Sequence, residues 1–292
     1  MKYLVVKGWL GFGDRLESLK MAVKFALDNK LKIYVDWTDS IWSHGTETFY
    51  TYFNLVNMDT LASLDDIPED ATVYPEYWKD HMKEPISNEL IQSHPELNLG
   101  TLNDDLKKKT NADVIVFSSI GYRTLYIDSS FFANVFRVTD QRILSKVVQR
   151  KAAHNLPACL GIHVRGTDRV RTQTQREMKI QWMAISAVHN GAFNNKPMIG
   201  VADDNVSLRI WKNFFPQTVI LSELSLQNTN KGGNHNASKD QIKNSKDEMN
   251  VDMLVDFFTL ALCESVLTTY KDSRFAQEAR RLHPVINRIL GQ

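Results

Sequence analysis

A cluster of charged side chains follows an apolar run in the middle of the chain, in the stretch CLGIHVRGTDRVRTQ that begins at Cys159. Arg165 stands directly after the predicted strand, where its guanidinium can present two parallel N–H donors to a phosphate. His163, two residues earlier, points to the same face of the strand. Asp168 either orients Arg165 or caps the next element. The stretch therefore predicts an anion-binding strand end, with a solvated strand-to-loop junction as the alternative.

A glycine-rich turn near the start of the chain is the second candidate. The segment GWLGFGDR places Gly11 and Gly13 between a predicted strand and a helix, with Asp14 and Arg15 directly after them. Glycines there let a ligand approach the backbone, and the N-terminus of the helix favours an anion. The dinucleotide-binding pattern G-x-G-x-x-G is incomplete, because Leu16 stands in the place of the third glycine. A tight structural turn is the competing interpretation.

Two more predicted strand ends carry polar side chains. The segment IGVADD ends in Asp203 and Asp204, which can bind a sugar or a base, coordinate a metal ion, or cap the next helix. The segment TTYKDSRF ends in Ser273, Arg274 and Phe275, where hydroxyl and backbone N–H groups can hold a diphosphate or simply cap a helix. No cluster of His, Cys and carboxylate residues has the spacing of a metal site, so none is expected.

The periodicity of apolar residues predicts two successive α/β units that position these segments. In the first half it predicts strands at 3–6, 32–36 and 114–118, a helix that Asp14 and Glu17 begin with a capping box, and a helix at 141–154. In the second half it predicts strands at 158–164, 198–202, 218–221 and 265–269, and helices near 176–189, 206–214, 252–262 and 275–282. The polar stretch 227–248 is predicted to be a mobile loop, and residues 37–106 have no clean period.

These alternations predict an α/β fold of two Rossmann-like domains, residues 1–156 and 157–292, with a cleft between them. The linker is the segment Asn155-Leu156-Pro157. Ligands of such sheets bind beyond the carboxyl ends of the strands. The charged and glycine-rich segments described above all occupy such positions, which favours a nucleotide-binding site.

Composition excludes several classes of protein. The 292 residues carry a net charge of +1, so no overall field favours nucleic acid or an anionic membrane. Both cysteines lie in apolar segments and are expected to be buried thiols. No apolar run is long enough for a signal peptide or a membrane span. A cytoplasmic location is expected.

The combination of segments resembles the fucosyltransferase superfamily, which includes the rhizobial nodulation fucosyltransferases, the core α-1,6-fucosyltransferases of animals and the protein O-fucosyltransferases. GIHVRGTDR is similar to the family's His-Val-Arg-x-Thr-Asp strand end, and KGWLGFGDRLESL to its glycine-rich turn. VADDNVSL is similar to its Ala-Thr-Asp-Asp segment, and DFFTLALCESVLTTYKDSRFAQEA to its closing strand and helix. The similarity spans residue 7 to about residue 279 but omits the stretch between about 40 and 110.

The resemblance implies a GT-B-like fold in which two domains face each other across a cleft, the first on the acceptor side. It implies an inverting glycosyltransferase of polysaccharide biosynthesis that moves L-fucose from GDP-fucose to a glycan or glycolipid-type acceptor, with no metal and no other cofactor. Arg165 matches the family arginine that grips the β-phosphate of the donor. Its role would be to stabilise the charge on the GDP leaving group.

The resemblance also assigns the remaining residues to the donor site. His163 would lie against the donor, Asp203 or Asp204 near the sugar or base, and Asp256 at a guanine-contacting position. The residues near the diphosphate would be Ser273, Arg274 and Phe275. The residues that border the cleft from the first domain would be Gly11, Gly13, Asp14 and Arg15.

Two departures from the family pattern concern the donor contacts and the base. Gly166 stands where core α-1,6 enzymes carry a second arginine, and Gln173 where they carry an acidic candidate base. Transfer with inversion needs activation of the acceptor or a dissociative transition state. Glu177, Asp168 and Asp14 remain as candidate bases.

Alternative functions stay open. These alternatives are a glycosyltransferase for another nucleotide sugar, a nicotinamide-dependent oxidoreductase, and a non-catalytic protein that binds a nucleotide or a glycan. Four aromatic residues of the first domain are placed either in the core or in stacking contact with an acceptor sugar: Trp37, Trp42, Tyr50 and Tyr52. The identity of the acceptor and the oligomeric state do not follow from the sequence.

Overall fold

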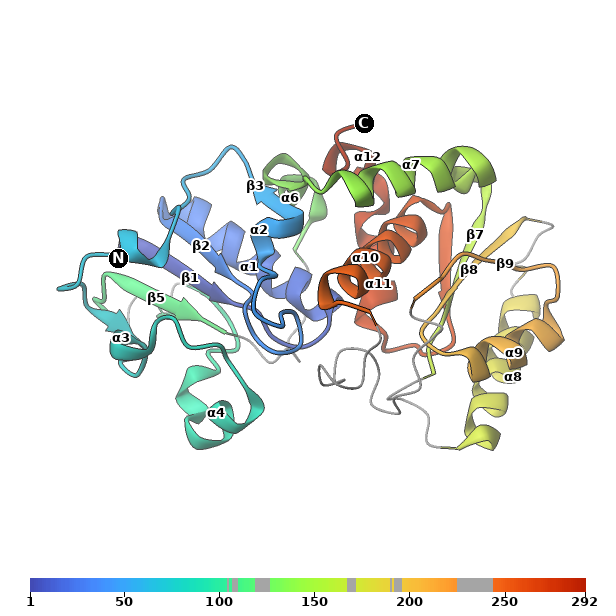
Figure 1. The fold of residues 1–292 in the computed structure, drawn as a ribbon, viewed down its shortest axis with the longest axis horizontal. Coiled ribbons are helices and arrows are strands. Elements are labelled where there is room, and N and C mark those ends of the chain that lie inside the picture. Colours follow the sequence, from blue (N-terminus) through green and yellow to red (C-terminus); the bar gives the residue numbers. More distant parts are fainter. Residues whose placement is uncertain are drawn as a thin grey trace. The chain divides into compact units, whose positions relative to one another are not determined.

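The computed structural model describes most of the chain (Figure 1). The described residues are 1–103, 105–106, 110–118, 127–166, 172–189, 191, 196–224 and 244–292, without the side chains at 173, 176, 184, 185 and 187–189. Contacts divide the chain into a first unit, Met1–Thr139 with Arg288–Gln292, and a second unit, Asp140–Asn287. Within the described ranges, no helix is both long enough and apolar enough to cross a lipid bilayer.

The first unit is built on a parallel sheet with the strand order β2-β1-β5-β4. Its elements are β1 (Tyr3–Lys7), α1 (Phe12–Asn29), β2 (Lys32–Asp36), α2 (Phe49–Tyr52), β3 (Phe53–Leu55), β4 (Val73–Tyr74), α3 (Trp78–His81), α4 (Asn88–Ser93), β5 (Val114–Phe117), α6 (Ser129–Val135) and β6 (Phe136–Val138). Strands β3 and β6 form a separate antiparallel pair. The predicted strand, glycine turn, helix and strand at the start of the chain are confirmed.

Helix α1 begins earlier than the sequence predicts. It starts at Phe12, and Gly11, in extended conformation, occupies the N-cap position without a side-chain hydrogen bond to the helix. The predicted capping box of Asp14 and Glu17 is therefore wrong. Asp14 lies instead within the first turn, where its carboxylate interacts favourably with the helix dipole.

Aromatic side chains fill the core of the segment that shows no clear periodicity. Trp37, Trp42 and Tyr52 are each at most 2% exposed. The Trp42 ring meets that of Trp37 edge-on at 4.9 Å and that of Tyr52 at 5.6 Å. Tyr50 is partly buried, and its hydroxyl accepts a 3.2 Å hydrogen bond from the backbone N–H of Val35. Of the two interpretations of these residues, the structure supports the core.

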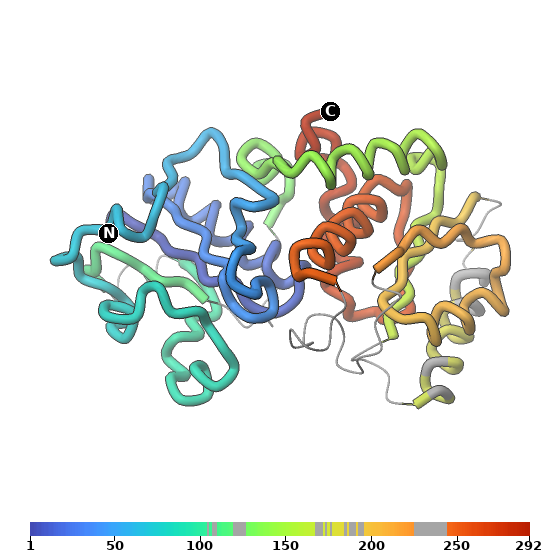
Figure 2. The backbone as a smooth tube through the Cα atoms, in the orientation of Figure 1, coloured from blue at the N-terminus to red at the C-terminus, as the bar shows by residue number. Residues whose placement is uncertain are grey.

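The second unit is also built on a four-stranded parallel sheet, in the order β10-β7-β8-β9. Its elements are α7 (Gln141–His154), β7 (Leu160–Val164), α8 (Gln173–His189), β8 (Met198–Ala202), α9 (Asn205–Phe214), β9 (Val219–Ile220), α10 (Lys246–Leu262), β10 (Ser265–Thr268) and α11 (Arg274–Leu282), and α12 (Ile286–Ile289) follows at the end of the chain. Figure 2 traces this path by colour, from the green of α7 to the red of β10.

The strands and helices predicted for the second half of the chain are all present, with small shifts at their ends. The largest shift is at α10, which begins at Lys246 because Ser245 and Glu248 form a capping box there. Of the predicted loop at 227–248, residues 227–243 lie outside the described ranges. The prediction that this loop is mobile is therefore untested.

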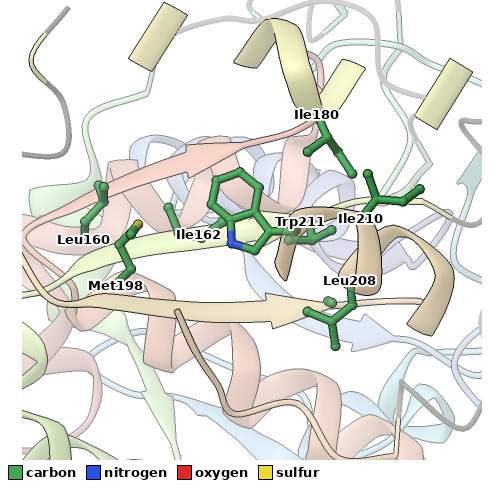
Figure 3. Packing of buried hydrophobic residues seen from close by; sticks show 9 residues of the cluster. Leu160, Ile162, Ile180, Met198, Leu208, Ile210 and Trp211 are labelled. Atoms are coloured by element: carbon green, nitrogen blue, oxygen red, sulfur yellow. The ribbon is translucent and has the colours of Figure 1, made fainter. Parts of the chain in front are cut away.

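Alternation along β7 divides its side chains between two layers of helices. The residues that pack toward α8 and α9 are Leu160, Ile162 and Val164. Figure 3 shows this cluster gathered around the indole of Trp211. On the other face, a Cβ atom added at Gly161 would lie 3.1 Å from the Cβ of Cys263, directly after α10, and the His163 ring stacks on Phe275 of α11 at 5.1 Å. His163 therefore faces α10 and α11.

Helix α7 belongs to the second unit, whereas the sequence places the domain boundary after it, at residue 156. Arg150, a buried residue of α7, makes polar links to the rest of this unit. Its Nη1 donates a 2.8 Å hydrogen bond to Oδ1 of Asp256 on α10, and its Nη2 donates to the carbonyl of Leu221, directly after β9. The Asp256 carboxylate also accepts a hydrogen bond from the Ser222 hydroxyl. These bonds tie α7 to α10 and to the sheet.

We expect Arg150→Met to destabilise the second unit more strongly at pH 8 than at pH 5. Burial and the nearby charge of Asp252 raise the pKa of Asp256 to about 6. At pH 8 the variant leaves the carboxylate without its cation in a buried site, and because the group can protonate instead, the pH-dependent penalty reaches at most about 3 kcal/mol. At pH 5 the carboxyl group is largely protonated, so Arg150 contributes less. Urea unfolding at the two pH values measures the difference.

The direction of this pH dependence of stability follows from proton linkage. The native state holds the Asp256 proton to a higher pH than the unfolded chain, so the carboxyl group stabilises the fold less as pH rises through about 6. Loss of Arg150 raises this pKa further and enlarges the penalty above pH 6. The double variant Arg150→Met/Asp256→Asn is the control, because it removes the titrating group. Equal losses at both pH values for the single variant would contradict this account.

Candidate functional site

The strand order of the second unit places a topological switch point between β7 and β10. From β7 the chain runs through α8, β8 and α9 to β9 on one side, while β10 pairs with β7 on its other side. Ligands of open α/β sheets bind beyond the carboxyl ends of the strands at such a point. Arg165, Asp203 and Ser273 follow β7, β8 and β10, so the fold brings these predicted residues to one edge of the sheet.

Asp203 joins the ends of β7 and β8. Its Oδ2 lies 3.1 Å from Nη1 of Arg165, and its Oδ1 accepts a 2.7 Å hydrogen bond from the backbone N–H of Gly166. The Arg165 side chain keeps 21% of its surface exposed. A guanidinium that is both oriented and accessible can meet an anion without first reorganising.

Gly166 has no room for a side chain. A Cβ atom there would lie 1.6 Å from Oδ2 of Asp204 and 2.1 Å from the hydroxyl oxygen of Ser207. Asp204 is held in place because it caps α9, its Oδ1 accepting a 2.9 Å hydrogen bond from the backbone N–H of Ser207. The capping role considered for Asp204 is confirmed, and it explains why a glycine follows Arg165.

His163 is buried beneath the same edge, with 4% of its surface exposed. Its Nδ1 lies 3.1 Å from the hydroxyl oxygen of Thr268 and 3.3 Å from that of Ser273, and its ring stacks on Phe275. Burial, reinforced by nearby arginine charges, lowers its pKa to about 3. The imidazole is therefore neutral at physiological pH and links β10 to the start of α11.

The first turn of α11 contains the other residues predicted on this side. Ser273 is the N-cap residue, and its hydroxyl accepts a hydrogen bond from the backbone N–H of Ala276. Phe275 packs between His163 and Phe257, whose ring it meets nearly at right angles at 5.1 Å. Arg274, the first residue of the helix, is partly exposed. Ser273 and Phe275 thus take part in internal contacts of this edge.

Two predicted residues, Asp256 and Glu177, occupy other positions in the second unit. Asp256 is 4% exposed, and its two oxygens contact Arg150 and the hydroxyl of Ser222, next to β9. Glu177 is exposed on α8. Asp168 lies outside the described residues. Among the side chains that the structure does describe, no group of three or more His, Cys, Asp or Glu is placed to hold a metal ion.

In the first unit, Arg15 is buried rather than at a ligand-facing surface, contrary to the prediction. Its Nη1 and Nη2 donate hydrogen bonds of 2.9 and 2.7 Å to the two carboxylate oxygens of Asp39, and its Nε donates to the carbonyl of Leu10. The guanidinium also lies over the rings of Trp37 and Trp42. Arg15 therefore holds the glycine-rich turn against the core.

The glycine that this turn requires is Gly8, which opens the glycine-rich segment but is not among its predicted ligand-binding residues. A Cβ atom at Gly8 would lie 2.1 Å from Nη1 of Arg15 and 2.2 Å from the Trp37 ring. At Gly11 the nearest atom to an added Cβ is Oδ2 of Asp14, at 3.7 Å, an ordinary contact. Gly13 lies within the first turn of α1 and is buried. Of the residues predicted in this unit, Gly11 and Asp14 are partly exposed, whereas Gly13 and Arg15 are buried.

Among known proteins, this chain matches solved structures, but it matches no family model and no curated sequence. Among solved structures, the fucosyltransferase NodZ from Bradyrhizobium is 17% identical, with 96% of this chain and 92% of that chain covered and a TM-score of 0.68.

Two further structures match at lower scores. POFUT1 in complex with GDP-fucose is 11% identical, with coverage of 96% and 94% and a TM-score of 0.56. A mutant of Arabidopsis thaliana FUT1 in complex with GDP is 13% identical, with coverage of 97% and 68% and a TM-score of 0.54. The predicted resemblance is confirmed at the level of structure: the chain has an α/β fold similar to that of these fucosyltransferases.

Proposed function

We propose that this protein is a glycosyltransferase that transfers L-fucose from GDP-fucose to a glycan or glycolipid-type acceptor, with inversion at the sugar carbon and without a metal ion. The observation that carries the proposal is the position of Arg165. It stands at the switch point of the second sheet, in a chain whose fold is similar to that of NodZ, and its guanidinium is held by Asp203 while the side chain stays partly exposed.

The proposed chemistry is a single displacement. An acceptor hydroxyl oxygen forms a bond to the anomeric carbon of fucose and loses its proton to a base, while the bond from that carbon to the β-phosphate breaks and GDP leaves with the electron pair. Negative charge grows on the diphosphate in the transition state. Arg165 stabilises that charge through two N–H donors, and its orientation before binding reduces the reorganisation that the step requires.

The base remains one of three carboxylates. Glu177 is exposed on α8, Asp14 lies in the first turn of α1, and Asp168 follows Arg165 closely in the chain. His163 is a poor candidate, because its lowered pKa makes the neutral imidazole a weak base. Its proposed part is to shape the donor side of the site together with Ser273.

The wider proposal follows the family resemblance. The two units would form a GT-B arrangement, with the second unit binding the donor and the first, through Gly11 and Asp14, facing the acceptor. The enzyme would act in the cytoplasm in the biosynthesis of a polysaccharide or a related glycan. Asp204 would be near the sugar or base, and Asp256 would influence base recognition through Ser222.

We expect Arg165→Ala to lower kcat/KM by roughly two to four kcal/mol of transition-state stabilisation, a loss of about 30- to 1000-fold. Arg165→Lys should recover part of this loss, because it keeps the charge without the bidentate fork. Turnover of GDP-fucose, by transfer or hydrolysis, is measured with EDTA present. Arg209→Ala on α9, which removes an exposed arginine, is the matched control. Unchanged turnover in Arg165→Ala would refute the assigned role, and loss of wild-type activity in EDTA would refute metal independence.

We expect the protein to bind GDP more tightly than UDP or dTDP. GDP and UDP share the ribose and the diphosphate, so the difference between them measures contacts to the base, whereas dTDP also lacks the ribose 2′-hydroxyl. Isothermal titration calorimetry with the three nucleotides measures it directly. Tighter binding of UDP or dTDP would indicate a different nucleotide sugar, and binding without turnover would indicate a non-catalytic binding protein.

A further inference from the structure

The hydroxyl group of Thr269 binds both backbone groups of Arg165. Its oxygen accepts a 2.8 Å hydrogen bond from the backbone N–H of Arg165, and its O–H donates a 3.2 Å hydrogen bond to the carbonyl of the same residue. The backbone N–H of Thr269 donates to the carbonyl of His163 at 3.0 Å. Thr269 thus bonds three backbone groups at the end of β7.

These bonds occur where the ladder between β7 and β10 stops. The last paired residues are His163 and Thr268, and the bond from Thr269 to His163 continues the parallel pattern by one step. At the next step of a parallel ladder, a backbone carbonyl of the neighbouring strand would accept from Arg165. The Thr269 side chain accepts this bond instead. The chain after β10 can therefore turn away while the backbone at Arg165 keeps its place.

The other side of the same segment is held by Asp203. One carboxylate oxygen binds the backbone N–H of Gly166 and the other binds the guanidinium of Arg165. Residues 165 and 166 are thus fixed from both neighbouring strands, through Thr269 on the β10 side and Asp203 on the β8 side. An arginine whose backbone and guanidinium are both fixed presents its N–H donors in one geometry.

We propose that Thr269 is a positioning residue for Arg165, whose backbone it fixes so that the guanidinium meets the diphosphate of the donor in a preformed orientation. The inference rests on the proposed function for the identity of that ligand. Thr269 is not itself a ligand contact: it is 6% exposed, and its hydroxyl both donates to and accepts from the Arg165 backbone. The sequence pattern predicts the hydroxyls of this segment as diphosphate contacts, whereas the Thr269 hydroxyl binds the Arg165 backbone.

The test compares Thr269→Val, which keeps the shape but lacks the hydroxyl, with Thr269→Ser, which keeps the hydroxyl. Affinities for GDP and for inorganic pyrophosphate are measured by calorimetry, with thermal unfolding alongside. We expect Thr269→Val to bind both ligands about tenfold more weakly, because the variant lacks the hydroxyl that holds the Arg165 backbone. Thr269→Ser should stay within about twofold of wild type. Should Thr269→Val not fold, Thr269→Ala removes the same hydroxyl with less crowding.

A matched control separates positioning from general stability. Thr218→Val removes a buried hydroxyl at the amino end of β9, where it accepts a 2.9 Å hydrogen bond from the indole of Trp211. We expect this variant to unfold at a lower temperature with unchanged affinity for GDP and pyrophosphate. If Thr218→Val weakens binding as much as Thr269→Val does, the effect is one of stability and the proposal fails.

A double-mutant cycle shows whether Thr269 acts through Arg165. In the Arg165→Ala background, Thr269→Val should cause no further loss of affinity. An equal loss in both backgrounds would overturn the proposal. The failure of the proposed function has a different signature: a wild-type protein that binds pyrophosphate but not GDP, with the Thr269 effect still present on pyrophosphate. Wild-type protein that binds neither ligand would overturn both.

Discussion

The carboxylate of Asp203, which binds the backbone of Gly166 with one oxygen and the guanidinium of Arg165 with the other, is the contact on which the edge of the second sheet depends. Where parallel strands end, their backbone N–H groups lose the partners that the ladder supplied and need others if they are buried. Side-chain oxygens from the next strand supply them: Asp203 for Gly166, Thr269 for Arg165, and Ser222 for Ala202. Side-chain to backbone hydrogen bonds therefore link the ends of neighbouring strands. These polar side chains stabilise the edge of the sheet.

This use of polar groups explains how far the sequence could predict the site. Apolar runs bounded by charges identify the buried parallel strands and their carboxyl ends well, because both faces of such strands are covered by helices. Arg165 and Asp203 were found in this way. The same pattern cannot say which hydroxyl or carboxylate faces outward, so Thr269 was grouped with ligand contacts although its hydroxyl serves the backbone.

Buried ion pairs are the features that the sequence conceals most. Lys7 binds Asp36 at the ends of β1 and β2 and also donates to the carbonyls of Met82 and Glu84. Burial lowers the pKa of this lysine, although Asp36 opposes the shift. Arg15 with Asp39 and Arg150 with Asp256 are further pairs of this kind. Their partners lie 24 or more residues apart in the chain, so no local spacing reveals them, and a buried arginine resembles a ligand-binding one until its partner is known.

The contact between Gly166 and the cap of α9 constrains how this chain can change. Any residue larger than glycine at 166 would collide with Asp204 and Ser207, which are held together by the cap itself. A mutational path to a second arginine after Arg165 must therefore begin on the neighbouring strand and helix, with replacement of the capping carboxylate, before position 166 can accept a side chain. Each step taken alone is unfavourable, so the order of substitutions matters. A substitution at position 166 is in this sense coupled by epistasis to the helix cap that follows β8.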